Sequence, residues 1–132
     1  NHLGSRIESQ QELEDFLKAV PGASLLLDVG HLAGAFGDNV EIIRKYYDRI
    51  VSVHFKDIFI KDASLGLDRW TERLRFCELG AGNAGFDFAA AGEELKRHGY
   101  DKWVLIEHDT HLREPLTDLK VSADALKAIF KS

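Results

Sequence analysis

The sequence is poor in sulphur, in net positive charge and in long apolar runs. It contains no methionine, a single cysteine at position 77 and a formal net charge of −5. A lone cysteine excludes an intramolecular disulfide and fits a reducing compartment, so we expect a cytoplasmic protein. The acidic balance argues against a nucleic-acid partner, because neutralising phosphates requires an excess of lysine and arginine. No apolar run approaches the length of a membrane span, so we expect no membrane partner.

Length and composition are those of an ordinary globular domain. The 132 residues are 45% hydrophobic and 30% charged, which predicts one hydrophobic core and a single domain over residues 1–132. The missing methionine extends to position 1, where a complete gene product normally carries one. We therefore expect this chain to be part of a longer protein.

Three short apolar runs each end in a polar residue that can bind a metal or move a proton. Leucines 25–27 run into Asp28, residues 51–53 run into His54, and residues 104–106 run into Glu107. A short run that is apolar on both faces is typical of a strand buried on both sides of a parallel sheet. In parallel α/β proteins, functional sites are built at the carboxyl ends of such strands.

Helix signals separate the three predicted strands. Ser9 and Glu12 form a capping-box pattern before a helix that Pro21 and Gly22 end, and further helices are predicted at about 39–47, 86–98 and 115–130. Residues 30–39 read as a glycine-rich loop, and 56–85 as a long irregular segment with a possible strand at 75–79. Strands alternating with helices predict an α/β fold with a parallel sheet.

The three strand-end residues favour a shared metal site. The carboxyl ends of parallel strands lie side by side, so Asp28, His54 and Glu107 can converge. Two carboxylates and an imidazole suit a divalent metal ion such as Mn²⁺, Co²⁺, Mg²⁺ or Zn²⁺. Any one of them alone is more often a helix cap or an ion-pair partner, and it is the repetition that favours ligation. We expect His31 to face a substrate, because Gly30 lets the backbone turn it inward.

Other polar residues have competing interpretations. Lys56 and Asp57 fit either a solvated loop pair or, through the cation, a contact with a polyol or anionic substrate. His98 fits a helix C-terminus, where its partial charge favours the dipole, and Cys77 fits simple packing. His108 and His111 flank the last predicted strand without a clear preference for either role.

Several ordered motifs resemble a known family. They are Leu-Asp-Val-Gly-His at 27–31, Val-His-Phe-Lys-Asp at 53–57, Glu-Leu-Gly-Ala-Gly at 78–82, Gly-Tyr-Asp-Lys-Trp at 99–103 and Ile-Glu-His-Asp at 106–109. Together they resemble the sugar phosphate isomerase/epimerase family of the xylose isomerase-like TIM-barrel superfamily. That superfamily includes inosose dehydratase, ketose 3-epimerases and hydroxypyruvate isomerase.

The resemblance implies the C-terminal half of a (β/α)₈ TIM barrel, from the end of strand 5 through helix 8. It also implies one divalent metal ion on four strand-end ligands, of which Asp28, His54 and Glu107 match three. The fourth, a glutamate, is expected just upstream of the chain. By the same resemblance, Glu107 shuttles the proton and His31 contacts substrate oxygens, and we also assign substrate binding to three further residues: His2, Lys56 and Asp109.

The function expected from residues and resemblance is a metal-dependent sugar or sugar phosphate isomerase/epimerase. It would transfer a proton next to a carbonyl through an enediolate of a small sugar or polyol substrate. An inosose dehydratase-like lyase acting on a cyclic polyol ketone is the first alternative. An endonuclease IV-like enzyme would need more ligands and a basic groove, and a half-barrel that has lost its chemistry is the remaining alternative. A half-barrel has two open sheet edges and an exposed apolar face, so we expect it to need its missing N-terminal half, a second copy or a rearrangement.

Overall fold

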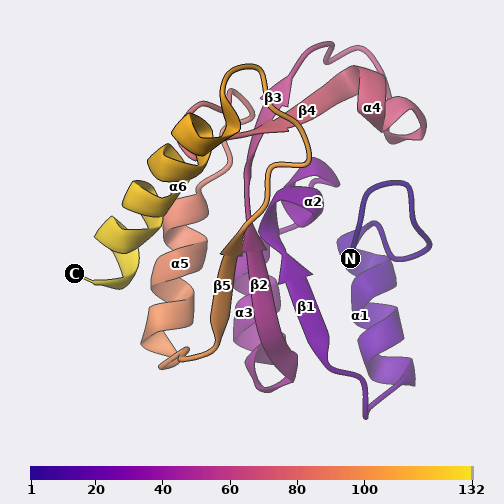
Figure 1. Cartoon of the computed structure of the whole chain (residues 1–132). Helices are drawn as coiled ribbons and strands as arrows, with labels where there is room; N and C mark the ends of the chain where they lie inside the picture. Colours follow the sequence, from indigo (N-terminus) through magenta and orange to yellow (C-terminus); the bar gives the residue numbers. More distant parts are fainter. Residues whose placement is uncertain (132) are drawn as a thin grey trace.

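The computed structural model describes residues 1–131, which build a three-stranded parallel sheet with flanking helices (Figure 1). The sheet contains β1 (Leu25–Asp28), β2 (Ile50–Phe55) and β5 (Trp103–Ile106), in the order β1-β2-β5. Both pairings are parallel, as the alternation of strands and helices predicts. An antiparallel hairpin of β3 (Asp57–Ile60) and β4 (Leu74–Cys77) extends past the carboxyl end of β2.

Four longer helices pack around the sheet, and each begins at a side-chain cap. They are α1 (Gln10–Ala19), α3 (Asn39–Tyr46), α5 (Phe88–Arg97) and α6 (Pro115–Phe130). The capping box predicted for α1 is present, and acidic side chains cap the other three. Figure 1 shows α1 beside the β1 edge of the sheet and α6 beside the β5 edge. Short helical segments complete the chain: α2 (Val29–Gly34), η1 (Tyr47–Arg49), η2 (Leu67–Arg69) and α4 (Trp70–Arg73).

The helices cover only one face of the sheet. Leu27, Val53 and Phe55 are fully buried in the main core, together with apolar residues of all four longer helices. On the opposite face, Leu26 is 43% exposed and its neighbour two strands away, Trp103, is 77% exposed. The expectation that the first strand is buried on both faces is therefore wrong, because nothing among the described residues covers this second face.

Two segments predicted to be irregular are ordered in the structure. The segment 30–39 begins with α2, which starts because the Asp28 side chain accepts a hydrogen bond from the His31 amide. The segment 56–85 contains the hairpin, and the strand expected at 75–79 is β4 at Leu74–Cys77. A second, smaller apolar cluster, which includes Leu3 and Phe76, holds the hairpin against α2. No helix among residues 1–131 is long and apolar enough to cross a membrane.

Candidate metal centre

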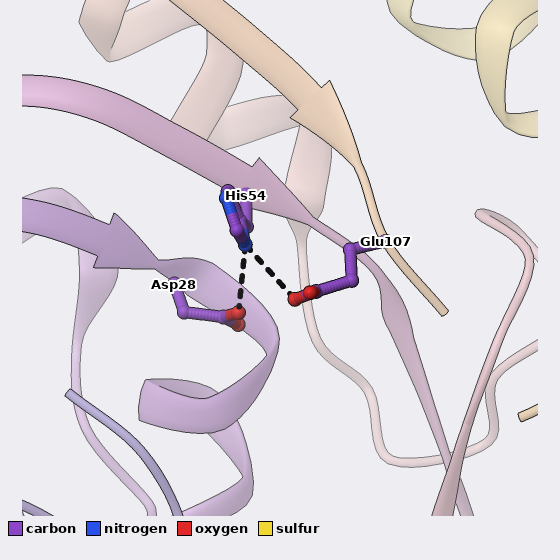
Figure 2. Close-up of side chains that lie close together, drawn as sticks. All are labelled: Asp28, His54 and Glu107. Carbon is purple, nitrogen blue, oxygen red and sulfur yellow. Dashed lines mark hydrogen bonds and ion pairs between the residues drawn. The ribbon is translucent and has the colours of Figure 1, made fainter. Parts of the chain in front are cut away.

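The sheet register brings Asp28, His54 and Glu107 to one place on the open face. Asp28 pairs with His54 across β1 and β2, and Glu107 follows the last residue of β5. The nearest ligand atoms of the three residues all lie within 4.8 Å of one another. His54 Nδ1 is 2.9 Å from Glu107 Oε2 and 3.7 Å from Asp28 Oδ2 (Figure 2). The structure thus brings together the three residues predicted as ligands, and their role in ligation stays a prediction.

The two oxygen atoms of Asp28 have different partners. Oδ1 accepts the His31 amide hydrogen at 2.9 Å, which caps α2, while Oδ2 faces His54. The Asn1 side chain pairs with the Asp28 backbone through two hydrogen bonds and fixes the end of β1. Burial of Asp28 raises the pKa of its carboxyl group, against the opposing effect of Lys56. The helix-cap interpretation and the ligand interpretation of this residue are therefore compatible.

Lys56 lies in the middle of the cluster and is fully buried. Its Nζ atom donates to Glu107 Oε2 at 2.8 Å and to Asp109 Oδ2 at 2.7 Å, and it lies 3.0 Å from Asp28 Oδ2. Burial alone would lower the pKa of Lys56, but Asp28 and the hydrogen bonds from the ammonium to the carboxylates outweigh it and raise the pKa. Lys56 is thus an ammonium ion inside the site, and the solvated-pair interpretation of Lys56 and Asp57 is wrong.

Glu107 is held as a carboxylate by its neighbours. Partial burial acts to raise its pKa, but the hydrogen bonds from Lys56 and His54 outweigh burial and lower the pKa to about 2. Its side chain is 43% exposed, so it is also the member of the cluster most open to a molecule in solution. An ionised, accessible carboxylate is the form that accepts a proton from carbon.

The hydrogen bonding of His31 fixes its tautomer. The Leu3 amide donates to His31 Nδ1 at 3.0 Å, so Nδ1 is the acceptor and the neutral ring carries its proton on Nε2. Burial, with Lys56 nearby, lowers the pKa of His31 to about 3, which keeps the ring neutral. Its Nε2 is buried without a hydrogen-bond partner and lies 3.6 Å from Asp109 Oδ2. A buried donor that lacks a partner suits a substrate oxygen.

The remaining predicted substrate residues lie at different distances from the ligands. Asp109 reaches Lys56 and has a positive φ of 61°, a conformation that is rare outside glycine. The His2 ring packs against His31 with ring centroids 3.7 Å apart, and its other ring neighbour is Trp70. Asp109 therefore belongs to the cluster itself, whereas His2 supports His31 from behind.

Two features of the motifs were not foreseen from the sequence. A Cβ atom on Gly30 would lie 2.2 Å from Lys56 Cγ, so glycine at this position makes room for the lysine stem. This differs from the expected role of Gly30 in turning His31, because Gly30 lies within α2 at an ordinary φ. Asp57 accepts the amide hydrogens of Gly80 and Gly82 at 2.9 and 3.2 Å, and it holds the loop after β4 instead of contacting the site.

Other candidates have structural contacts. His108 is buried, and its Nε2 lies 2.8 Å from Ser122 Oγ, which ties the loop after β5 to α6. His98 is the C-cap of α5 and stacks on Tyr47. Cys77 is buried, and burial raises the pKa of its thiol to about 12, so it is not a thiolate nucleophile.

The donor set fits a divalent metal ion. Two carboxylate oxygens and one imidazole nitrogen converge, and the cluster already surrounds one positive charge, the ammonium of Lys56. To bind a metal through Nδ1, the neutral His54 ring must carry its proton on Nε2. Oxygen and imidazole ligands without sulphur are typical of Mn²⁺, Co²⁺, Mg²⁺ or Zn²⁺.

Relatives of the chain include a rhizopine catabolism protein and inosose dehydratases. The chain is 33% identical over 134 residues to the rhizopine catabolism protein MocC of Rhizobium meliloti, with 96% of this chain and 41% of the relative covered. It is 28% identical over 113 residues to inosose dehydratase of Geobacillus thermodenitrificans, with 81% and 38% covered. The chain thus spans about two fifths of the length of these relatives.

Two solved structures share the fold of this chain. A xylose isomerase domain protein from Planctomyces limnophilus matches the whole chain and 45% of its own, with a TM-score of 0.66 and 23% identity. A sugar phosphate isomerase/epimerase from Parabacteroides distasonis matches 95% of the chain and 42% of its own, with a TM-score of 0.63 and 17% identity. These likenesses show the fold, which is part of a TIM barrel.

The family described as xylose isomerase-like TIM barrel matches residues 1–129. The match confirms the family resemblance read from the five motifs and the prediction of a C-terminal half-barrel with parallel strands and flanking helices. The chain belongs to the xylose isomerase-like TIM barrel family.

Proposed function

We propose that this chain carries the catalytic half of a divalent-metal-dependent sugar or sugar phosphate isomerase/epimerase. The observation that carries the proposal is the convergence of Asp28, His54 and Glu107 at the ends of three adjacent strands. They lie on the face of the sheet that no helix among residues 1–131 covers. A solved structure of the same fold bears the name sugar phosphate isomerase/epimerase, which supports this reaction class.

The proposed chemistry uses the geometry of each side chain. Asp28, His54 and Glu107 would hold the metal, which would supply a positive charge that polarises the carbonyl and hydroxyl oxygens of a substrate. Glu107, ionised and 43% exposed, accepts the proton from the carbon next to the carbonyl and, in an isomerisation, returns it to the neighbouring carbon on the same face. In an epimerisation, a second acid on the other face of the enediolate, such as the glutamate expected upstream, would return the proton. An enediolate of the substrate is the intermediate between the two proton transfers.

Orientation of the substrate falls to His31 and Asp109. The His31 ring can donate from Nε2, and the Asp109 carboxylate can accept, so the two together match a hydroxyl group that both accepts and donates. Burial of His31 keeps water from competing for this donor. A small sugar or polyol carries several such hydroxyls, which makes it the substrate class that this pair suits.

A second candidate function is an inosose dehydratase-like lyase. It is supported by the inosose dehydratases of Geobacillus thermodenitrificans and Clostridium tetani, each 28% identical to this chain. The first step would be the same proton removal by Glu107, and the second would expel a hydroxyl group in place of returning the proton. The ammonium of Lys56, which Asp109 holds at 2.7 Å, would donate the proton with which the hydroxyl group leaves as water.

Two experiments test the proposal. Calorimetry of Mn²⁺ with the chain extended at its N-terminus through the expected missing half of the barrel should show one binding site, and Asp28→Ala should remove it. Keto-sugars and inososes are then incubated in deuterated water with Mn²⁺ and followed by proton NMR. Exchange of one carbon-bound proton with formation of an isomer would support the isomerase/epimerase, and loss of water from an inosose would support the lyase. Absence of Mn²⁺ binding would favour a half-barrel without metal chemistry and would overturn both functions.

A further inference from the structure

Lys56 contacts the oxygen atoms that the proposed metal needs. The Oε2 atom of Glu107 lies 2.9 Å from His54 Nδ1 and 2.8 Å from Lys56 Nζ. The Oδ2 atom of Asp28 lies 3.7 Å from His54 Nδ1 and 3.0 Å from Lys56 Nζ. On both acids, the oxygen nearest to the imidazole is thus also the one that faces the ammonium.

The position of Lys56 is built into the fold. It is the only fully buried lysine among residues 1–131, and its ammonium lies 4.7 Å from the centroid of the Phe76 ring. Its stem occupies the space that glycine leaves at position 30. A buried charge is stable only when it is paired, and here the partners are the carboxylates of the site itself.

A metal and this ammonium cannot hold the same two oxygens without strong repulsion. A divalent ion bound between Asp28 and Glu107 would lie within a few ångströms of the charge of the fully buried lysine. Asp109 offers the ammonium an alternative partner at 2.7 Å and is not among the residues that converge as ligands. The side chain can therefore give up Asp28 and Glu107 and keep one carboxylate.

We propose that Lys56 is an internal cation that occupies the metal-binding carboxylates until a divalent metal displaces it towards Asp109, and that it thereby limits the affinity of the site for the metal. The inference rests on the proposed metal site and adds a regulatory element to it. In the absence of metal, Lys56 keeps the acidic side chains assembled; in its presence, the ammonium lies beside Asp109 and Nε2 of His31, where a substrate oxygen would bind.

The test compares Mn²⁺ binding by calorimetry to the unaltered chain and to Lys56→Met, both extended at the N-terminus through the expected missing half of the barrel. The substitution keeps most of the apolar stem and removes the charge. Competition predicts binding to Lys56→Met at least about tenfold tighter. A merely structural lysine would give weaker binding or no change. Lys120→Met, on the exposed side of α6, is the matched control and should change the affinity less than about twofold.

Thermal unfolding gives a second readout on the same proteins. Without metal, Lys56→Met should unfold at a lower temperature than the unaltered chain, because its carboxylates are left without their cation. With saturating Mn²⁺ this difference should shrink or reverse, since the metal neutralises the acids in place of the lysine. A constant difference with and without Mn²⁺ would contradict the inference.

A measurement on the unaltered chain covers the case in which Lys56→Met does not fold. The ammonium protons of a buried, paired lysine exchange slowly with water. Its ¹⁵N resonance can therefore be observed separately from those of exposed lysines. Titration with Zn²⁺ should move this resonance until one equivalent is bound, and a resonance unchanged at saturation would overturn the inference. Equal Mn²⁺ affinity of both chains would overturn the inference alone, whereas no binding to either chain would overturn the metal site as well.

Discussion

The two faces of the parallel sheet differ although the same three strands form them. On the covered face, Leu27, Val53 and Phe55 are fully buried under helices. On the open face, Leu26 and Trp103 are largely exposed, and the carboxyl ends of the strands carry the acids and the imidazole of the candidate site. The comparison shows that the covered face supplies most of the burial that stabilises the chain, while the open face carries the chemistry.

The comparison is tested most strongly by one truncation on each face. Phe55→Ala removes a fully buried ring from the main core and should lower the free energy of unfolding by about 3–5 kcal/mol. Leu26→Ala, on the open face, should cost under about 1 kcal/mol, because the side chain is already 43% exposed. Urea unfolding measures both variants. Equal losses would mean that another molecule covers the open face in solution.

On the open face, Glu107→Gln should have the largest effect on activity. It replaces the proposed proton acceptor and one ligand with a neutral amide, so turnover should fall by at least about 100-fold and Mn²⁺ binding should weaken. His98→Ala is the control, because His98 lies at the end of α5 away from the open face. If Glu107→Gln retained both turnover and Mn²⁺ affinity, Glu107 would not be part of the site.

His31 should make the free energy of unfolding of the chain depend on pH. Burial lowers its pKa to about 3 in the folded chain, whereas an unfolded histidine titrates near ~6.5. Between these values the unfolded state binds a proton that the folded state does not, so the free energy of unfolding falls as the pH decreases from 6.5. The loss attributable to His31 should reach about 2 kcal/mol at pH 5.

The variant His31→Gln separates this contribution from that of other groups. Glutamine can still accept the Leu3 amide hydrogen but does not titrate. Urea unfolding of both chains between pH 7 and pH 5 should show a shallower decline for His31→Gln. Parallel declines would mean that His31 is already accessible to protons in the folded chain.

A smaller effect is expected at Gly30, in α2 beside the Lys56 side chain. The added methyl group of Gly30→Ala would overlap Lys56 Cγ, so either α2 or the lysine stem must move. We expect a loss of about 1–2 kcal/mol, since overpacking outweighs the better helix propensity of alanine. Gly92→Ala is the comparison within α5, where the new Cβ would meet a side-chain methyl of Ile129 at 2.8 Å. A neutral or stabilising Gly30→Ala would mean that the space beside Lys56 is not needed.

The regular part of the fold was predictable because its signals are local. The cap at Ser9, the apolar runs before Asp28, His54 and Glu107, and Pro115 at the start of α6 each act within a few residues. The convergence of the three strand-end residues followed from the geometry of parallel strands alone. The helix boundaries agreed to within a few residues for the same reason.

The missed features depend on contacts between distant residues. The hairpin is held by packing against Leu3 and by Asp57, whose carboxylate binds two amides more than twenty residues away. The sequence leaves Lys56 between a solvated pair and a substrate contact and does not predict its burial, which depends on Gly30 and Phe76. The exposure of Leu26 depends on what covers the face, which no pattern within the strand reports.

Asp28 combines two tasks in one side chain, with one oxygen on the backbone of α2 and the other turned to the cluster. The Asp28 carboxylate therefore both fixes the orientation of α2, which carries His31, and contributes negative charge to the candidate site. A ligand that attracts Oδ2 of Asp28 would also shift the first turn of α2. It would thereby move the His31 ring, whose Nε2–H has no hydrogen-bond partner. Asparagine at this position would keep the cap and remove the charge, which makes it the substitution that separates architecture from chemistry here.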